Sequence, residues 1–429
     1  MKNKNTSVNN IFDVVVIGGG PAGMMAASEA ARRGATTALV EKNPEPGNKL
    51  LLTGKGRCNI TCGNTDPEHI VRAFGARGKF LYSSLALFGV SDTAAFFESR
   101  GLPLIKERGD RLFPEKGNAC SVLNILLEDL KRSGVTVKTG FEVVSVTQPS
   151  SAGGLFSVSN QSSEVYSRRL IVATGGCSFP STGSNGKGYG LVEKLGHSIV
   201  RPTPSLVPVR TKETWVKKLQ GLSLKNVSVS LLQGRKVIAS RFGEMLFTHF
   251  GISGPIVMDM SKIIGGYTSR EGVTLCIDLK PALSIEKLDK RLIRDFAANP
   301  GRKIGNSLYA LMPRPLVPVI LYLSGVSPEA PVDTISRVER GALCNTIKNI
   351  RLTPVSLLGF NWAIITSGGV NLKEINPATM ESKIVPGLYV AGEMLDLDGP
   401  TGGYNLQECW STGFVAGFEA GEQSLSSRA

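Results

Sequence analysis

The stretch DVVVIGGGPAG, residues 13–23, decides the fold of this chain. Residues 13–18 form an apolar, β-branched run that stops in glycines, which is typical of a buried parallel strand. Residues 22–33 follow with the Ala-rich pattern of a helix that Gly34 ends, and residues 37–40 have the pattern of a second strand. The three segments predict a βαβ unit, and therefore an α/β fold with a parallel sheet.

The turn between this strand and this helix carries Gly18-x-Gly20-x-x-Gly23, the spacing of dinucleotide-binding units. Gly18 permits the tight turn, Gly20 lets the backbone approach a pyrophosphate, and Gly23 lets the helix pack close to the strand. The helix start, at Pro21 and Ala22, directs free N–H groups and the positive end of the helix dipole at a phosphate. The sequence thus predicts a dinucleotide site at this turn.

An acidic residue, Glu41, ends the second strand 18 positions after Gly23. In a Rossmann-type unit such a residue accepts hydrogen bonds from ribose hydroxyls. We expect Lys42, and Val143 from a later segment, to line the same site.

Two distant segments favour FAD over NAD as the dinucleotide. LIVATGG, residues 170–176, resembles the strand-to-turn element of two-dinucleotide flavoproteins and places Ala173, Thr174 and Gly175 at the cofactor. GLYVAGE, residues 387–393, resembles their late motif, in which the acid after Gly392 binds the ribityl chain; here that acid is Glu393, where Asp is more usual. A second strand–GxGxxG–helix is missing, because the glycines at 183, 186, 188 and 190 have the wrong spacing.

Residues 47–62, GNKLLLTGKGRCNITC, follow the ribose-binding acid, and we expect this loop to return over the flavin. The candidate cofactor contacts in it are Lys49, Gly56, Arg57, Cys58 and Asn59. Arg57 is a positive neighbour that can lower the pKa of the Cys58 thiol, so Cys58 is a candidate proton donor to a reduced substrate. The alternative is a small buried residue that packs the loop.

Two further segments carry polar groups that could act in chemistry. Residues 392–413, GEMLDLDGPTGGYNLQECWSTG, place the candidate cofactor-binding residues Asp398, Gly403, Tyr404, Asn405 and Leu406 beside the predicted flavin. Residues 243–255, GEMLFTHFGISGP, hold His249, one of three histidines. His249 is either a second candidate proton donor or a structural residue.

The length and the cysteine content limit the number of domains and the kinds of protein to consider. A chain of 429 residues predicts two or three domains. Its seven cysteines, an odd number spread over the whole length, argue against a disulfide framework, and Cys58 and Cys62 have no second pair to complete a metal site. Residues 1–10 are polar, and no run approaches the ~18 apolar residues of a membrane span, so a cytoplasmic protein without a membrane partner is expected.

The pattern of predicted helices and strands changes along the chain and suggests one nucleotide-binding domain that is split in sequence. Helical patterns at 67–100 and 119–133 and strand patterns at 135–147 and 155–159 belong to residues 1–195, the first part of the FAD-binding domain. Residues 196–280 are β-rich, with strands at 227–232 and 273–279, and residues 281–352 are helical, with helices at 284–298 and 333–350. Residues 353–429 again have the Gly-rich α/β pattern and form the second part of the FAD-binding domain.

The positive charge is concentrated in the predicted insert. Residues 201–245 hold nine Lys and Arg against two Glu, and residues 281–351 hold eleven against six Asp and Glu. The net charges of +7 and +5 account for twelve of the fourteen excess positive charges. The insert is therefore either a solvated basic face or a surface for a polyanion such as nucleic acid.

Taken together, these segments resemble the bacterial NAD(P)/FAD-dependent oxidoreductases of the aminoacetone oxidase family, which includes a bile-acid 4,6-reductase type and a ribosomal RNA dihydrouridine synthase type. The matching stretches are VVVIGGGPAGMMAA, LLTGKGRCNIT, GDRLFPE, IVATGG, LFTHFGISGP, TSGGV and ESKIVPGLYVAGEMLDLDGPTGGYNLQECWSTG. The resemblance implies a Rossmann-type FAD-binding domain with an inserted β-barrel-like subdomain and a helical subdomain.

The substrates of these types share a C=C bond conjugated to a carbonyl, which reduced flavin can attack with hydride while an acid protonates the neighbouring carbon. The basic insert (201–245 and 281–351) favours an RNA partner, so the leading hypothesis is reduction of a uridine in ribosomal RNA with NAD(P)H as electron donor. Cys58 is the leading proton donor and His249 the second. The alternatives are an FAD enzyme that reduces a steroid or other enone or oxidises an amine, and an RNA-binding flavoprotein without chemistry on the RNA.

Overall fold

A computed structural model describes residues 10–151 and 153–426 of the chain. These residues form two compact units, each with its own hydrophobic core. The inserted unit is Ser205–Trp362, and the residues before and after it make up the first unit. The sequence placed the insert at 196–352. In the structure residues 196–204 stay with the first unit, where β10 (Ile199–Ser205) pairs with β18 (Ile365–Val370), and the inserted unit extends past residue 352 to Trp362 because β17 (Pro354–Leu357) pairs with its strand β11 (Val209–Thr211). The predicted β-rich and helical parts, 196–280 and 281–352, both fall largely within this one unit.

The first unit is built on a seven-stranded sheet in the order β6-β2-β1-β9-β8-β7, with β19 paired to β9. The strands are β1 (Ile11–Ile17), β2 (Thr37–Val40), β6 (Thr136–Lys138), β7 (Ser145–Thr147), β8 (Phe156–Ser159), β9 (Glu164–Val172) and β19 (Leu388–Val390). β1 pairs in parallel with both β2 and β9. Its residues Val14, Val15 and Val16 are fully buried, as the apolar run in the sequence predicts.

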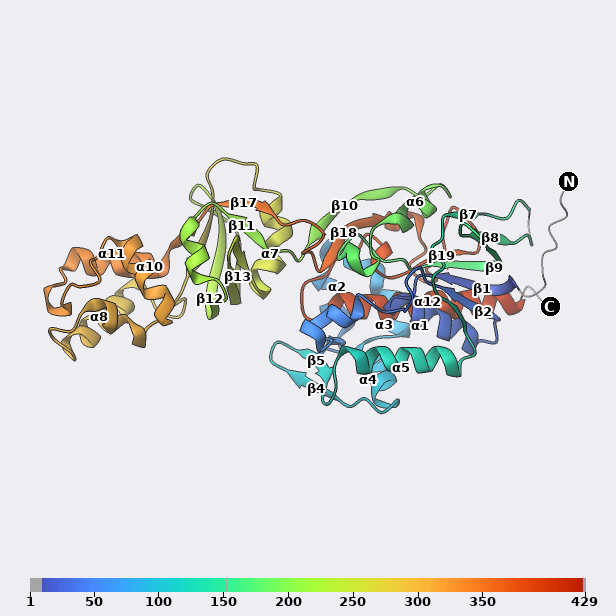
Figure 1. Cartoon of the computed structure of the whole chain (residues 1–429), viewed down its shortest axis with the longest axis horizontal. Coiled ribbons are helices and arrows are strands. Elements are labelled where there is room, and N and C mark those ends of the chain that lie inside the picture. The colour runs from blue at the N-terminus through green and yellow to red at the C-terminus, as the bar shows by residue number, and fades with distance from the viewer. Residues whose placement is uncertain (1–9, 152, 427–429) are drawn as a thin grey trace. The chain divides into compact units, whose positions relative to one another are not determined.

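Helices α1 (Pro21–Arg32) and α12 (Tyr404–Ser426) lie side by side (Figure 1). Three glycines spaced four residues apart on α12 face three alanines with the same spacing on α1. A Cβ at each glycine would lie 2.2–3.1 Å from its nearest α1 atom: Gly413 on Ala22, Gly417 on Ala26 and Gly421 on Ala30. Glycine is therefore needed for the two backbones to approach this closely. The contact sets the middle of α12, at Gly413, next to the first turn of α1.

The remaining elements of the first unit surround this core. They are η2 (Leu50–Gly56), α2 (Pro67–Ala73), η3 (Gly75–Leu81), α3 (Tyr82–Leu87), α4 (Val90–Glu98), α5 (Ala119–Arg132), α6 (Lys187–Glu193) and the small sheet of β3 (Thr61–Cys62), β5 (Arg111–Pro114) and β4 (Leu104–Glu107). The predicted helical region 67–100 is thus several short helices, interrupted at Gly75, which has a positive φ, and at Gly89, which caps α4.

Among the described residues, no single helix has both the length and the apolar composition of a membrane span. One bent pair, Gly75–Leu87 with Val90–Glu98, reaches those limits when its two helices are taken together.

The inserted unit contains a seven-stranded antiparallel sheet in the order β16-β15-β12-β13-β14-β11-β17. Its strands are β11 (Val209–Thr211), β12 (Ser223–Gln233), β13 (Lys236–Thr248), β14 (Gly251–Ser253), β15 (Val273–Asp278), β16 (Ile350–Leu352) and β17 (Pro354–Leu357). The two end strands, β16 and β17, are joined through Thr353 alone, so the sheet curls until its edges approach each other. The β-barrel-like part that the family resemblance implied is this curled sheet, with α7 (Pro255–Gly265) packed on it.

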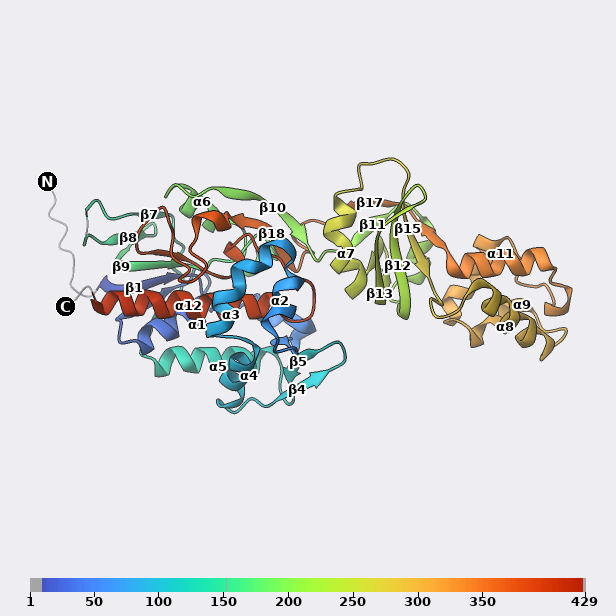
Figure 2. The same ribbon diagram turned by 180° about the vertical axis from the view of Figure 1, so that it is seen from behind.

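Residues 280–349 of the inserted unit are mainly helical. The helices are α8 (Ile285–Ala297), α9 (Ile304–Ser307), α10 (Val317–Ser324) and α11 (Arg337–Lys348). Figure 2 shows α8, α9 and α11 gathered beside one another. The fold class predicted from the sequence, a split Rossmann-type domain with a β-rich and helical insert, is confirmed.

Candidate functional site

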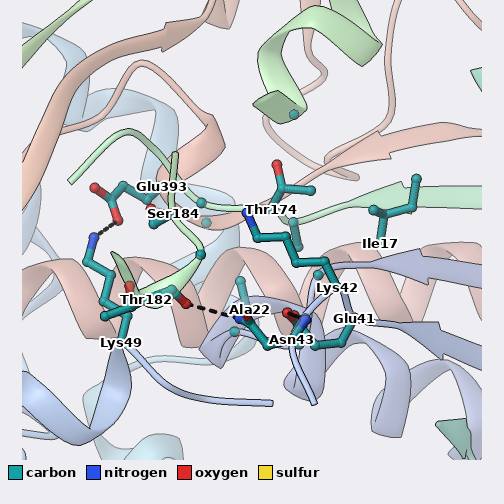
Figure 3. Close-up of a pocket in the computed structure, with 18 of the residues that line it drawn as sticks. Ile17, Ala22, Glu41, Lys42, Asn43, Lys49, Thr174, Thr182, Ser184 and Glu393 are labelled. Carbon is teal, nitrogen blue, oxygen red and sulfur yellow. Dashed lines mark hydrogen bonds and ion pairs between the residues drawn. The ribbon is translucent and has the colours of Figure 1, made fainter. Parts of the chain in front are cut away.

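A cleft of about 1010 Å³, open to solvent on one side, lies in the first unit at the carboxyl ends of β1, β2 and β9. Figure 3 shows its walls, which come from segments far apart in the chain, including Ile17, Glu41, Thr174, Ser184 and Glu393. Ligands of open α/β sheets bind at this edge of the sheet.

The three fingerprint glycines occupy three different environments. Gly18 has φ +106°, and a Cβ there would lie 2.5 Å from the carbonyl oxygen of Ala173. A Cβ at Gly23 would lie 1.9 Å from the carbonyl oxygen of Gly18. Gly20 lines the cleft, and a Cβ there would meet no atom within 4 Å. The outer two glycines are therefore required by the protein backbone itself, while Gly20 leaves space in the cleft.

The first turn of α1 presents its N–H groups to the cleft. Gly20 is its N-cap residue, and no side chain caps the helix. Pro21 occupies the first helical position, where its missing N–H costs no intrahelical hydrogen bond. Ala22, the next residue, lines the cleft. An uncapped helix N-terminus of this length binds an anion such as a phosphate.

Glu41 stands at the end of β2 with its carboxylate held in place by backbone N–H groups. Its Oε2 accepts a hydrogen bond from the Gly19 N–H at 2.7 Å, and its Oε1 accepts one from the Asn43 N–H at 2.8 Å. Each carboxylate oxygen keeps a further lone pair for a ribose hydroxyl. Lys42 beside it also lines the cleft, and burial lowers the pKa of its ammonium group.

Lys49 and Glu393 meet in the cleft although they are 344 positions apart in the sequence. The Lys49 ammonium lies 2.5 Å from Glu393 Oε2 (Figure 3). It also donates to Ser178 Oγ at 2.7 Å. Glu393 Oε1 accepts from Ser178 Oγ at 2.7 Å and from the Thr366 N–H at 2.8 Å. This network fixes both side chains at the point where the β9 and β19 turns converge.

Thirteen of the predicted cofactor-binding residues line the cleft: Gly18, Gly20, Pro21, Ala22, Glu41, Lys42, Lys49, Val143, Ala173, Thr174, Gly175, Gly392 and Glu393. Gly23 lies behind the wall, against Gly18. A segment that sequence reasoning set aside, residues 182–188, also lines the cleft. Its glycines do not form a second nucleotide motif; they bring the loop close to β2, where Asn43 Nδ2 donates to the Thr182 carbonyl at 3.0 Å.

Cys58 and its neighbours lie outside the cleft. The Cys58 side chain is fully buried, and desolvation raises the pKa of its thiol to about 12. The prediction that Arg57 lowers this pKa is wrong, because the Arg57 guanidinium stacks on the Phe113 ring and pairs with Glu107 at 2.5 Å. The roles of Cys58 and Arg57 at the cofactor stay predictions.

The loop around Cys58 is nonetheless unusual in conformation. Gly54, Lys55, Gly56 and Cys58 all have positive φ, and two of them are not glycine. A backbone that holds non-glycine residues in this region stores strain that neighbouring contacts must balance. Gly56 faces open space, so this loop stays accessible at its tip.

The loop before α12 packs on the strand that follows this segment. A Cβ at Gly403 would lie 2.3 Å from the backbone of Thr61. With its amide turned to satisfy its neighbours, Asn59 donates to the carbonyls of Leu112 and Thr61 and accepts from the Gly403 N–H at 2.9 Å. Two predicted site segments, 47–62 and 392–413, are therefore joined directly.

The predicted residues at the start of α12 have separate partners. Asn405 accepts from the Gly399 N–H at 2.8 Å and donates to the carbonyls of Gly399 and Pro400 at 3.1 Å, which shapes the loop. Asp398 accepts from Ser367 Oγ at 3.0 Å. Leu406 is half-buried against the core of the first unit.

Tyr404 Oη lies 2.9 Å from His69 Nε2, a histidine that sequence reasoning passed over. His69 is exposed and Tyr404 is half-buried, so solvent reaches both side chains. The other candidate acid, His249, lies in the inserted unit with its ring against Phe250, whose ring in turn contacts Trp362.

Glu408, one turn into α12, is a second group that the sequence did not single out. It is almost fully buried, and this burial raises the pKa of its carboxyl to about 8. Its neighbour Cys409 lines the cleft and donates from Sγ to Glu408 Oε2 at 3.5 Å.

These observations fit the phosphate and ribose groups of FAD. The uncapped α1 N-terminus and the open space at Gly20 suit a pyrophosphate, and Glu41 suits a ribose. Lys49 and Glu393 also line the cleft, and their charged groups suit the ribityl hydroxyls of the same cofactor.

The comparisons with known proteins agree with this geometry. Residues 12–419 match the family described as HI0933-like protein Rossmann domain. The chain is 34% identical to the 3-dehydro-bile acid delta(4,6)-reductase of Clostridium scindens over 95% of this chain and 98% of that protein. It is 30% identical to the ribosomal RNA dihydrouridine synthase of Escherichia coli over 94% of this chain and 96% of that one.

Among solved structures, the 3-ketosteroid-delta4-(5alpha)-dehydrogenase of Rhodococcus jostii RHA1 has the same fold, with a TM-score of 0.52, 17% identity, and coverage of 97% of this chain and 98% of that chain. The family match spans nearly the whole chain, and the cleft has the features that an FAD site requires. The chain therefore belongs to the HI0933-like family and is an FAD-dependent oxidoreductase of the Rossmann type.

Proposed function

We propose that this oxidoreductase reduces the C5=C6 bond of a uridine in ribosomal RNA, with NAD(P)H as the source of electrons. The observation that carries the proposal is the charge of the inserted unit. Residues 205–362 hold twenty-two Lys and Arg against eleven Asp and Glu, a net charge of +11, whereas the remaining residues carry twenty-seven against twenty-four. A folded RNA needs such a cationic surface outside the reaction site, and a small neutral substrate does not.

The relative named as a ribosomal RNA dihydrouridine synthase supports this reading, since the match covers both units. The relative named as a bile-acid reductase supports the alternative, a small conjugated enone as substrate. Both substrates present the same reacting group, so the flavin site itself does not discriminate between them.

When bound and reduced, FAD supplies the hydride that adds to the β carbon of the conjugated system. The protein then has to protonate the α carbon and to stabilise negative charge on the carbonyl oxygen. Cys58, the leading donor by sequence, is fully buried and protonated far above neutral pH. The Cys58 thiol carries a proton, but its buried side chain cannot contact a substrate in this conformation.

Tyr404 and His69 are better placed to deliver the proton. They are joined by a hydrogen bond of 2.9 Å, and Tyr404 lies in the chain between Glu393 and Cys409, which both line the cleft. We assign proton donation to the Tyr404 hydroxyl and its reprotonation to His69. In single turnovers, Tyr404→Phe should slow substrate reduction by about 10²–10⁴-fold while the bleaching of the flavin by NAD(P)H stays at its normal rate. Equal loss in both steps would contradict the assignment.

The substrate is tested by mass spectrometry of ribosomal RNA from a deletion strain. A uridine that carries two additional hydrogens should disappear and should return with the wild-type gene, but not with Tyr404→Phe. A complete set of reduced uridines in the deletion strain would exclude the RNA substrate and favour the enone. Anaerobic bleaching of the bound flavin by NADH or NADPH tests the electron donor separately, and unbleached flavin would remove NAD(P)H from the proposal.

A further inference from the structure

The sheet of the inserted unit buries one face and leaves the other open. Along β12, Val227, Val229 and Leu231 belong to the core of the unit, where α7 packs. The alternate residues, Ser228 and Ser230, point to the opposite face and are partly exposed.

The register of the strands shows what shares that open face. Phe242 of β13 lies opposite Ser228, and Ser240 lies opposite Ser230. On the other side of β12, Ser230 pairs with Cys276 of β15, which pairs with Arg351 of β16. Directly opposed residues in an antiparallel pair point to the same face, so these side chains form one surface. We name this surface the serine face: Ser228, Ser230, Ser240, Phe242, Cys276 and Arg351.

Phe242 is the aromatic group of the serine face and is 62% exposed. Its neighbours are hydroxyl groups rather than apolar side chains: Ser230 Oγ and Ser240 Oγ lie 2.9 Å apart, and Ser228 Oγ and Ser240 Oγ lie 3.3 Å apart. An isolated exposed ring among hydroxyls does not form the large continuous apolar patch of a stable protein interface. It does offer a flat surface on which one base can stack.

Cations border the serine face. Arg235 and Lys236 are exposed at the turn of the β12–β13 hairpin, and Arg351, itself part of the serine face, is exposed on β16. Asp278, opposite Ser228, has its charge balanced by Lys348 at 2.6 Å. The charge of the border is therefore complementary to a phosphate backbone.

The edge of the sheet is also accessible. Within residues 10–151 and 153–426, β13 pairs with β14 only at Leu246, Phe247 and Thr248, so its residues 236–245 have β12 on one side and no further strand on the other. A single strand of nucleic acid can reach Phe242 from that side.

We propose that the serine face binds a single-stranded segment of RNA, with one base stacked on Phe242 and the phosphates along the bordering cations. The proposal rests on the RNA substrate proposed above and identifies which surface holds it. Serine hydroxyls can donate and accept hydrogen bonds with base edges or ribose 2′-hydroxyls, and aromatic side chains stack bases in other sheets that bind RNA.

The test uses the full-length FAD-loaded protein and a fluorescein-labelled uridine dodecamer, with binding followed by anisotropy. Phe242→Ala should weaken binding by at least about fivefold, and Phe242→Trp should restore it, because one base stacked on an aromatic ring accounts for such a difference. The control is Val338→Ala, since Val338 is an apolar residue of the same unit, on α11, that is more exposed (82%) than Phe242. An unchanged affinity of Phe242→Ala, or an equal loss in the control, would overturn the proposal.

The salt dependence separates stacking from charge. Phe242→Ala should leave the slope of log affinity against log salt unchanged, whereas Arg351→Ala should reduce it by roughly 0.7. A 12-base-pair duplex RNA should bind without sensitivity to Phe242. If Phe242→Ala instead changes the oligomeric state in sedimentation and leaves RNA affinity intact, the face joins two copies of the chain and the proposal is wrong.

The binding experiment and the deletion-strain experiment can fail separately. A deletion strain that keeps all its reduced uridines would end the proposed function, while loss of dodecamer binding in Phe242→Ala would still support an RNA-binding face.

Discussion

Gly20 and Gly23 are neighbours in one turn, and their replacement by alanine should separate cofactor binding from folding. A Cβ at Gly20 meets nothing within 4 Å and projects into the cleft, whereas a Cβ at Gly23 would lie 1.9 Å from the Gly18 carbonyl oxygen. Gly20 has φ −81° and ψ −178°, which alanine adopts without strain.

The expected magnitudes differ for these two reasons. Gly20→Ala should change the stability of FAD-free protein by about 1 kcal/mol or less, since a poorer N-cap and a less flexible unfolded chain act in opposite directions. Gly23→Ala forces a backbone shift that costs about 1–3 kcal/mol. For a unit of this size these values correspond to changes in Tm of roughly 2 °C or less and roughly 2–6 °C.

Gly20→Ala, which costs little stability, should by contrast weaken FAD binding strongly. The methyl group of Gly20→Ala occupies the space where the pyrophosphate meets the N–H groups of α1, and the loss of one hydrogen bond to a charged group is worth about 1.5–3 kcal/mol. The dissociation constant of FAD should therefore rise by roughly 10–150-fold. Thermal unfolding of the FAD-free proteins and titration with FAD by flavin fluorescence measure both quantities. If Gly20→Ala loses as much Tm as Gly23→Ala, or keeps its FAD affinity within a factor of about two, the cleft has been assigned wrongly.

Further outcomes follow from single contacts. Because burial raises the pKa of Cys58 to about 12, iodoacetamide at pH 8 should label the exposed Cys120 and leave Cys58 unmodified in peptide mapping of the native protein; rapid labelling of Cys58 would show that its loop opens. Burial raises the pKa of Glu408 to about 8 from its ordinary value near 4.5, so folding takes up a proton and stability falls as pH rises between these values. Glu408→Gln should flatten that decline in Tm between pH 5 and pH 8.5, and an unchanged slope would place the titration elsewhere. Lys49→Met leaves Glu393 without its cation and should weaken FAD binding by roughly tenfold, while the exposed Lys131→Met serves as its control. Gly417→Val, at a site where even a Cβ lies 2.2 Å from the Ala26 carbonyl oxygen, should lower Tm with or without FAD, whereas Gly341→Ala on α11, where a Cβ meets nothing, should not.

Local patterns in the sequence predicted the elements that one short segment determines by itself. The apolar run of β1, the Ala-rich α1 and the glycine turn between them agree with the structure, because strand burial and helix capping depend on adjacent residues. The helical stretch 67–100 was less well predicted, since Gly75 and Gly89 break it into pieces.

Long-range pairings lay beyond sequence reasoning. Nothing near Lys49 indicates that its partner is Glu393, and the charge of Arg57 suggested an activated Cys58 only because Phe113 and Glu107 were not known to hold it. The loop 182–188 was dismissed because its glycines were compared with a helix-opening motif. Its actual part is to form a wall, which requires no fixed spacing.

The close packing of α12 on α1 has a consequence for the order in which the protein is made. α12 follows the inserted unit in the chain, so the ribosome completes residues 205–362 before it supplies the glycines that pack on Ala22, Ala26 and Ala30. The inserted unit is continuous and can fold during synthesis, whereas α1 has to wait with its alanine face uncovered. The nascent N-terminal segment is thus an expected client of chaperones, and the cofactor can be captured only late in biosynthesis.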